Sequence, residues 1–130
     1  MANLTKIYSD LDLTFTKRPV VGDVALKYDT QAVLNSIRNL VSTNHYERLF
    51  NPDLGSNIQA LLFENMTPMV SSSLEREITN LIETYEPRVK LHKVSVIANE
   101  SKNTYEVSVT FFIENATQAT TATLLLERVR

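Results

Sequence analysis

The most distinctive combination of ionisable groups in this sequence is Glu86-Pro87-Arg88, in which a proline separates a carboxylate from a guanidinium. If the chain is extended here, Glu86 and Arg88 project to the same side, because side chains alternate along a strand. Such a pair is often only a surface salt bridge, worth about 0–1 kcal/mol. The alternative is a recognition site, since arginine offers a rigid fork of donors to a partner's carboxylate or backbone oxygens. Both interpretations of this charged corner (Glu86, Pro87, Arg88) remain open.

Carboxylates are the other groups that could do chemistry, as the acid and base of a glycosidase. The candidates are Glu64, Glu75, Glu77, Glu83 and Glu86. Such a pair requires one carboxyl in an apolar cleft with a raised pKa. Because Glu75 and Glu77 lie two apart on a predicted helix, they do not face each other. A solvated helix face is therefore the favoured interpretation.

Other catalytic, metal and cofactor sites find no support. The chain has no cysteine and only two glycines, so thiolate sites and a glycine-rich phosphate loop are excluded. Neither His45 nor His92 has a partner at metal-ligand spacing. The sequence therefore predicts no catalytic, cofactor-binding or metal site.

The composition describes a single soluble domain. The 130 residues are 43% hydrophobic and 22% charged, with a formal net charge of −2. This slightly negative net charge gives no indication of a basic surface that would bind nucleic acid or an anionic membrane. No apolar run approaches the ~20 residues of a membrane span, and the first residues do not resemble a secretory signal.

Three predicted helices precede the charged corner. The first begins after Asp29 or Thr30, both good N-caps. The third begins at Thr67-Pro68, with a capping residue followed by proline, and ends near Tyr85, because Pro87 cannot continue it. Residues 1–28 read as an N-terminal arm with short extended pieces, and residues 29–130 as one domain.

Beyond Pro87 the hydrophobic period changes to two, which predicts strands. Residues 105–113 alternate in register, and a change of phase near His92–Lys93 indicates a β-bulge. A last strand covers Thr121–Leu126. The predicted fold class is α+β: three helices packed on one face of a three-stranded antiparallel meander, with an N-terminal extended arm.

The last strand would leave a free sheet edge. It consists of Thr121, Ala122, Thr123, Leu124, Leu125 and Leu126. Residues 119–126 contain neither proline nor charge, the usual devices that protect an edge from pairing. This docking edge (residues 121–126) could accept a strand from another chain, or the arm or a loop could cover it.

Several segments together resemble one family, the baseplate wedge proteins of contractile phage tails that carry a Glu-Pro-Arg motif, which have a counterpart in the type VI secretion baseplate. The motif is matched at residues 86–88, after the aromatic Tyr85. A loop pattern is matched at Thr43, Glu47, Arg48, Pro52 and Gly55, and the segments 6–10 and 62–68 resemble the T-even member. The chain departs at Tyr46, where the family commonly has glycine.

The resemblance implies a structural, non-enzymatic protein of the virion tail, assembled in the host cytoplasm and present in several copies in a six-fold baseplate. It implies that Glu86, Pro87 and Arg88 contact the core bundle of other wedge proteins. It also implies that the tail sheath protein docks on residues 121–126 by strand addition. A peptidoglycan-degrading glycosidase, suggested by the family's lysozyme-like label, is the alternative function; a generic adaptor is a third.

Overall fold

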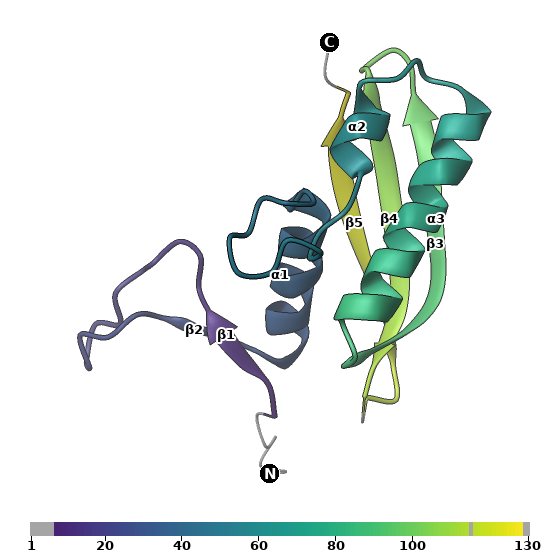
Figure 1. Cartoon of the computed structure of the whole chain (residues 1–130). Coiled ribbons are helices and arrows are strands. Elements are labelled where there is room, and N and C mark those ends of the chain that lie inside the picture. The colour runs from purple at the N-terminus through teal and green to yellow at the C-terminus, as the bar shows by residue number, and fades with distance from the viewer. Residues whose placement is uncertain (1–6, 115, 129–130) are drawn as a thin grey trace.

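The computed structural model describes residues 7–114 and 116–128 (Figure 1). Two short strands come first, followed by three helices and three longer strands. These elements are β1 (Ser9–Leu11), β2 (Leu26–Tyr28), α1 (Asp29–Ser42), α2 (Ile58–Leu62), α3 (Pro68–Tyr85), β3 (Val89–Asn99), β4 (Thr104–Ile113) and β5 (Ala119–Glu127). Helices thus precede the charged corner and the main sheet follows it, as the sequence predicts.

The main sheet is an antiparallel meander with the order β3-β4-β5. Its register shifts between Leu91 and Lys93, so His92 is the extra residue and the predicted bulge is confirmed. The bulge keeps Val89 and Leu91 on the same face as Val94, although the sequence phase changes between them.

The core lies between this sheet and the helices. Alternate residues of β4 are buried: Tyr105, Val107, Val109, Phe111 and Ile113. Helix α3 contributes Val70, Leu74, Ile78, Leu81 and Ile82. In Figure 1, α2 and α3 lie on the same side of the sheet, and α1 lies beside them, next to β5. The other face of the sheet carries half-exposed serine and threonine at Ser108 and Thr110.

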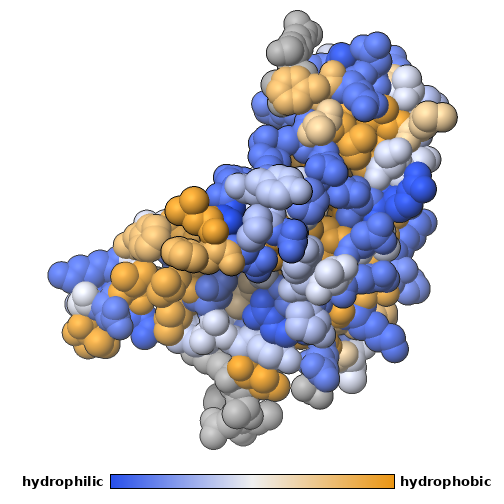
Figure 2. Space-filling view, in the orientation of Figure 1, coloured by the Kyte–Doolittle hydropathy of each residue, from blue (hydrophilic) through white to orange (hydrophobic). Residues whose placement is uncertain are grey.

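The N-terminal segment forms a separate two-stranded ribbon, in which Ser9 pairs with Tyr28 and Leu11 with Leu26. It projects away from the helices and the main sheet (Figure 1). Several of its apolar side chains are exposed, among them Phe15, Val20 and Val21, and Figure 2 shows this projecting part rich in hydrophobic residues. Two strands alone are marginally stable in water, so the contacts at the base of the ribbon matter for its position.

The loop between α1 and α2 folds back on itself around Gly55. Asn44 and Ser56 form an isolated parallel bridge, and the Ser56 amide donates to the Thr43 carbonyl at 3.1 Å. Tyr46, where the resembling family commonly has glycine, adopts a left-handed backbone with φ +65°. Glycine accepts that conformation at no steric cost, so a glycine at this position, as the resemblance implies, would fit the same loop.

The loop is also attached to the end of α3. The Tyr85 hydroxyl donates a 2.7 Å hydrogen bond to the carbonyl of Asp53. The loop pattern and the residue before the charged corner are far apart in sequence, and this bond brings them together.

No helix in the described part of the chain combines the length and hydropathy that a membrane crossing requires.

Candidate functional site

The charged corner lies where α3 gives way to β3. Thr67 caps the start of α3 by accepting the Val70 amide at 3.3 Å, and Pro68 occupies the first turn, as predicted. The helix ends at Tyr85. The amide of the next residue, Glu86, still donates a 2.9 Å hydrogen bond to the Ile82 carbonyl. Pro87 then redirects the chain into β3.

Glu86 and Arg88 form a bidentate ion pair. Arg88 Nε lies 2.6 Å from Glu86 Oε1, and a terminal guanidinium nitrogen lies 2.8 Å from Oε2. Glu86 is only 2% exposed, whereas the Arg88 side chain is 27% exposed. The interpretation as an exposed surface salt bridge is therefore wrong. The carboxylate is an internal anchor, and only Pro87 and the outer part of Arg88 reach solvent.

The pairing changes the pKa of both groups. Burial raises the pKa of the Glu86 carboxyl, but the hydrogen bonds and charge of Arg88, with the Ser36 hydroxyl of α1, lower it more. The pKa of Glu86 therefore lies below its ordinary value. Hydrogen bonding to Glu86 in turn raises the pKa of Arg88, against the effect of burial. Both groups are charged at neutral pH.

This lowered pKa predicts a contribution to acid stability. Because the folded pKa of Glu86 lies below the unfolded value of about 4.3, the ionised carboxylate stabilises the fold fully above that value. The contribution is lost as the pH falls through the folded pKa. We expect Glu86→Gln to flatten the decline of unfolding free energy below about pH 4.3, measured by urea denaturation at stepped pH. Glu83→Gln, an exposed change on α3, is the control. An unchanged slope in Glu86→Gln would contradict the assignment.

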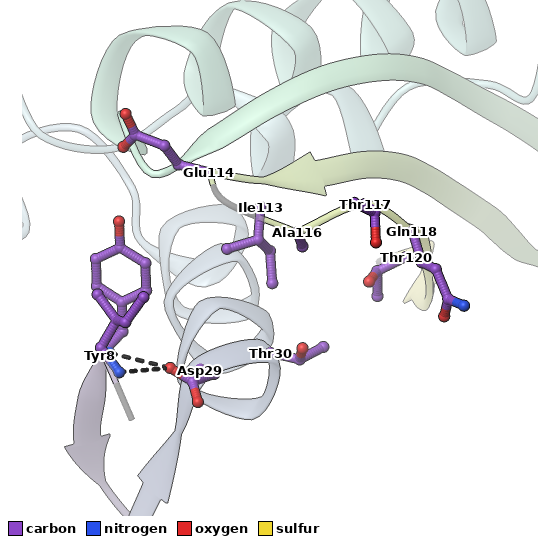
Figure 3. Close-up of a pocket in the computed structure, with 10 residues that line it drawn as sticks. Tyr8, Asp29, Thr30, Ile113, Glu114, Ala116, Thr117, Gln118 and Thr120 are labelled. Carbon is purple, nitrogen blue, oxygen red and sulfur yellow. Dashed lines mark hydrogen bonds between the residues drawn. The ribbon is translucent and has the colours of Figure 1, made fainter. Parts of the chain in front are cut away.

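Tyr8 of the ribbon covers the guanidinium of Arg88. The Arg88 Cζ lies 5.4 Å from the centre of the Tyr8 ring, within the range of a cation–π contact. Tyr8 is itself held by Asp29, whose Oδ1 accepts the amides of Ile7 and Tyr8 at 3.0 and 3.1 Å (Figure 3). The Asp29 amide donates back to the Tyr8 carbonyl at 2.9 Å. The ribbon is thus attached to the charged corner.

This use of Asp29 corrects the predicted helix cap. The N-cap of α1 is Tyr28, no side chain caps the helix, and Asp29 is its first residue. Asp29 has a left-handed backbone, with φ +45°, which aspartate tolerates better than most residues. Its carboxylate is directed at the ribbon instead of at its own helix, a choice that local sequence does not reveal.

Two open cavities adjoin the corner. One, of about 400 Å³, is lined by Tyr8, Asp29 and Glu114 among others, and Figure 3 shows its lining. The other, of about 620 Å³, is lined by Pro87, Arg88 and Lys90 with Phe112. Both share Ile113, Glu114 and Ala116. The exposed side of the corner is therefore a hollowed surface with both charge signs.

The carboxylates do not form a catalytic pair in the described residues. Asp29 and Glu114 line the same cavity, but the Asp29 carboxylate accepts two backbone amides and Glu114 extends away from it (Figure 3). Glu77 accepts the Asn57 amide at 3.2 Å, while Glu64, Glu75 and Glu83 are exposed. Among the described carboxylates, the pKa values of Asp12 and Glu86 are shifted, and both are lowered. A glycosidase general acid needs a raised pKa instead.

The histidines do not converge on a site either. His45 lies in the loop beside Tyr46, and His92 meets Phe112 edge to face at 6.0 Å. Within residues 7–114 and 116–128, no three potential metal-ligating side chains cluster.

The docking edge lies on β5, which runs from Ala119 to Glu127 and is therefore longer than predicted. In the described sheet β5 pairs only with β4, through Ala122 with Val109 and Leu124 with Val107. Ala122 and Leu124 face the core, whereas Thr121, Thr123 and Leu125 are exposed. Because Ala119 pairs with Phe112 and Val89 with Ile113, β5 begins at the end of the sheet that carries the charged corner.

Solved structures with this fold include two baseplate chains and a tail protein. A Geobacter sulfurreducens protein with a provisional tail-lysozyme name matches with a TM-score of 0.75 and 18% identity, over 82% of this chain and 97% of its own. A chain of the anti-feeding prophage baseplate matches with a TM-score of 0.64 and 20% identity, over 95% and 87%. A chain of the type VI secretion baseplate complex matches with a TM-score of 0.60 and 17% identity, over 73% and 89%.

Sequence similarity is more specific. The baseplate wedge protein gp25 of Enterobacteria phage T4 is 34% identical over 113 residues, which are 87% of this chain and 85% of that protein. The family described as baseplate wedge protein gp25 matches residues 27–121. The chain belongs to this family. It is a wedge component of a contractile-tail baseplate, located in the virion among other baseplate proteins present in several copies.

Proposed function

We propose that this protein links two neighbours in the baseplate without catalysing a reaction. Its charged corner binds the core bundle formed by other wedge proteins, and its docking edge starts the tail sheath by accepting a strand from the first sheath subunits. The observation that carries the proposal is the outer edge of β5, which pairs with no other strand of the described chain.

The two edges of the sheet differ in a way that favours β5 as the acceptor. The β3 edge carries a bulge at His92 between the exposed Lys90 and Lys93. Bulges and lysines discourage strand pairing. β5 pairs with β4 through nine consecutive residues without a register shift, and its residues 119–126 carry no charge and no proline. Main-chain hydrogen bonds to such an edge supply affinity that does not depend on a preformed pocket.

The charged corner supports the proposed contact with the core bundle because its residues have different roles. Glu86 is buried and fixes the guanidinium plane, and Tyr8 covers part of that plane. Pro87 stiffens the turn and leaves its own ring exposed. A core-bundle protein would therefore meet an arginine that has already lost most of its rotamer freedom, which reduces the entropic cost of binding.

Proline substitutions test the docking edge. The amides of Leu124 and Leu125 point in opposite directions, because alternate amides of a strand face alternate neighbours. Proline at one position therefore removes a bond to β4, and at the other it removes a donor from the free edge. Leu124→Pro and Leu125→Pro are made separately, and circular dichroism identifies the variant that stays folded, which is the one that loses the free-edge donor. We expect this folded variant to lose most sheath formation on purified baseplates, counted by electron microscopy. Normal sheaths on a folded proline variant would exclude this edge.

A matched pair of lysine variants serves as the control. Ile97 and Leu125 both pair with Glu106, on its two sides, and are 61% and 71% exposed. Leu125→Lys places a charge on the β5 edge and should reduce sheath initiation, whereas Ile97→Lys places it on the β3 edge and should not. Equal defects in both variants would indicate a general surface effect.

The glycosidase alternative has one observation in its favour, the provisional name of the Geobacter sulfurreducens protein. A turbidity assay on purified peptidoglycan separates the two functions. Our proposal predicts no clearing above that of a heat-denatured sample, and clearing that disappears on substitution of a carboxylate would favour the glycosidase.

A further inference from the structure

A groove runs between α1 and the docking edge. It has a volume of about 320 Å³ and is lined by Arg38, Val41 and Ser42 of α1 and by residues 123–126 of β5. Val41 and Leu124, 4% and 8% exposed, give it an apolar floor. Arg38 is the one charged side chain in this lining, and it is exposed.

Arg38 forms no ion pair among the residues that the structure describes. The positions three and four residues away on α1 are Leu34, Asn35, Val41 and Ser42, so the helix itself offers no carboxylate at contact spacing. The Ser42 hydroxyl donates a 2.9 Å hydrogen bond to the backbone carbonyl of Arg38. This bond does not involve the guanidinium. The guanidinium is therefore available to a partner.

A strand added to β5 would reach this groove. It would lie about 4.8 Å beyond β5, with its side chains alternating between the two faces of the sheet. Those on the face of Ala122 and Leu124 point toward the helices, because these two residues are buried against the core. Their neighbours in the groove would be Val41 and Arg38.

We propose that the strand that docks on β5 carries an aspartate or glutamate on its α1-facing side. This carboxylate pairs with Arg38, while an apolar side chain two residues away packs on Val41 and Leu124. The inference rests on the strand addition proposed above and specifies the chemistry of its partner. Arg38 then sets the register, because a slip of one residue moves the carboxylate to the opposite face of the sheet.

The test uses charge reversal in intact baseplates with purified sheath protein. We expect Arg38→Glu to reduce the fraction of baseplates that carry sheath by about tenfold or more, and Arg38→Lys to reduce it less, because lysine keeps the charge but not the fork. Arg76→Glu is the matched control, an exposed arginine of α3 outside the groove. Arg38→Glu should be rescued by a sheath subunit in which the pairing acidic residue of its docking strand is changed to lysine.

The outcomes separate this inference from the proposed function. If the folded proline variant fails to initiate sheath while Arg38→Glu behaves as wild type, strand addition stands and the Arg38 pairing is wrong. If the folded proline variant initiates normally, the proposed function itself is wrong. If Arg38→Glu fails but no charge-reversed sheath strand rescues it, Arg38 binds a different anion and the inference is overturned.

Discussion

Replacing Gly55 with alanine should lower the free energy of unfolding by about 3 kcal/mol or more, because two independent penalties act at one position. A Cβ there would lie 2.6 Å from the Asn44 carbonyl carbon and 2.8 Å from the Thr43 carbonyl oxygen. Both neighbours are backbone atoms that the Asn44–Ser56 bridge holds in place. The residue also has φ +130°, which side-chain-bearing residues rarely adopt. Urea unfolding followed by circular dichroism measures the effect.

Gly22→Ala is the control for Gly55→Ala. Gly22 also has a positive φ, +74°, but a Cβ there would meet only the Lys17 side chain, at an ordinary 3.5 Å. Its substitution carries the backbone penalty alone, about 1 kcal/mol. Similar losses in the two variants would mean that the loop around Gly55 can open without affecting the core.

Removing the guanidinium at the charged corner should have the second large effect. Arg88→Met leaves the Glu86 carboxylate, 2% exposed, without the partner that compensates its burial. Breaking such a pair from one side costs about 3 kcal/mol, while a well-packed apolar replacement of both members is close to neutral. We therefore expect Arg88→Met to be less stable than the double variant Glu86→Leu/Arg88→Met, by thermal and urea unfolding.

The same variants separate stability from partner binding. A pull-down with co-expressed wedge-core proteins, below the melting temperature of every variant, measures binding alone. If the corner is a recognition site, the double variant should be folded but should lose binding. If the double variant binds as wild type, the pair acts only within the fold, and the core-bundle contact lies elsewhere.

Much of the fold could be predicted because its signals are local. The alternation of β4, the Thr67-Pro68 helix start and the stop at Pro87 each depend on neighbours in sequence. Even the bulge at His92 was predictable, because a β-strand has a period of two and any extra residue shows as a change of phase. The resemblance to a wedge family rested on motifs, and the comparisons confirm it.

The site was harder to predict because its decisive contacts are long-range. The burial of Glu86 depends on α1 and the ribbon packing against the corner, and nothing in Glu86-Pro87-Arg88 records this. Asp29 is a good helix cap by type, but its carboxylate bonds to residues 7 and 8, more than twenty positions away. Arg38 gave no sequence signal beyond the lack of an acid at helical spacing. The partner roles of the corner and the docking edge stay predictions.

The β-bulge at His92 has a consequence for how copies of this chain can assemble. Because it distorts one edge of the sheet and leaves the other regular, the two edges are not interchangeable templates. Copies of the chain cannot readily stack β3 on β5 into an endless ribbon. Strand pairing with another chain is therefore favoured on one side of the sheet, the side of β5. Under the function proposed above, a sheath that begins on a ring of these proteins would inherit a single direction of growth.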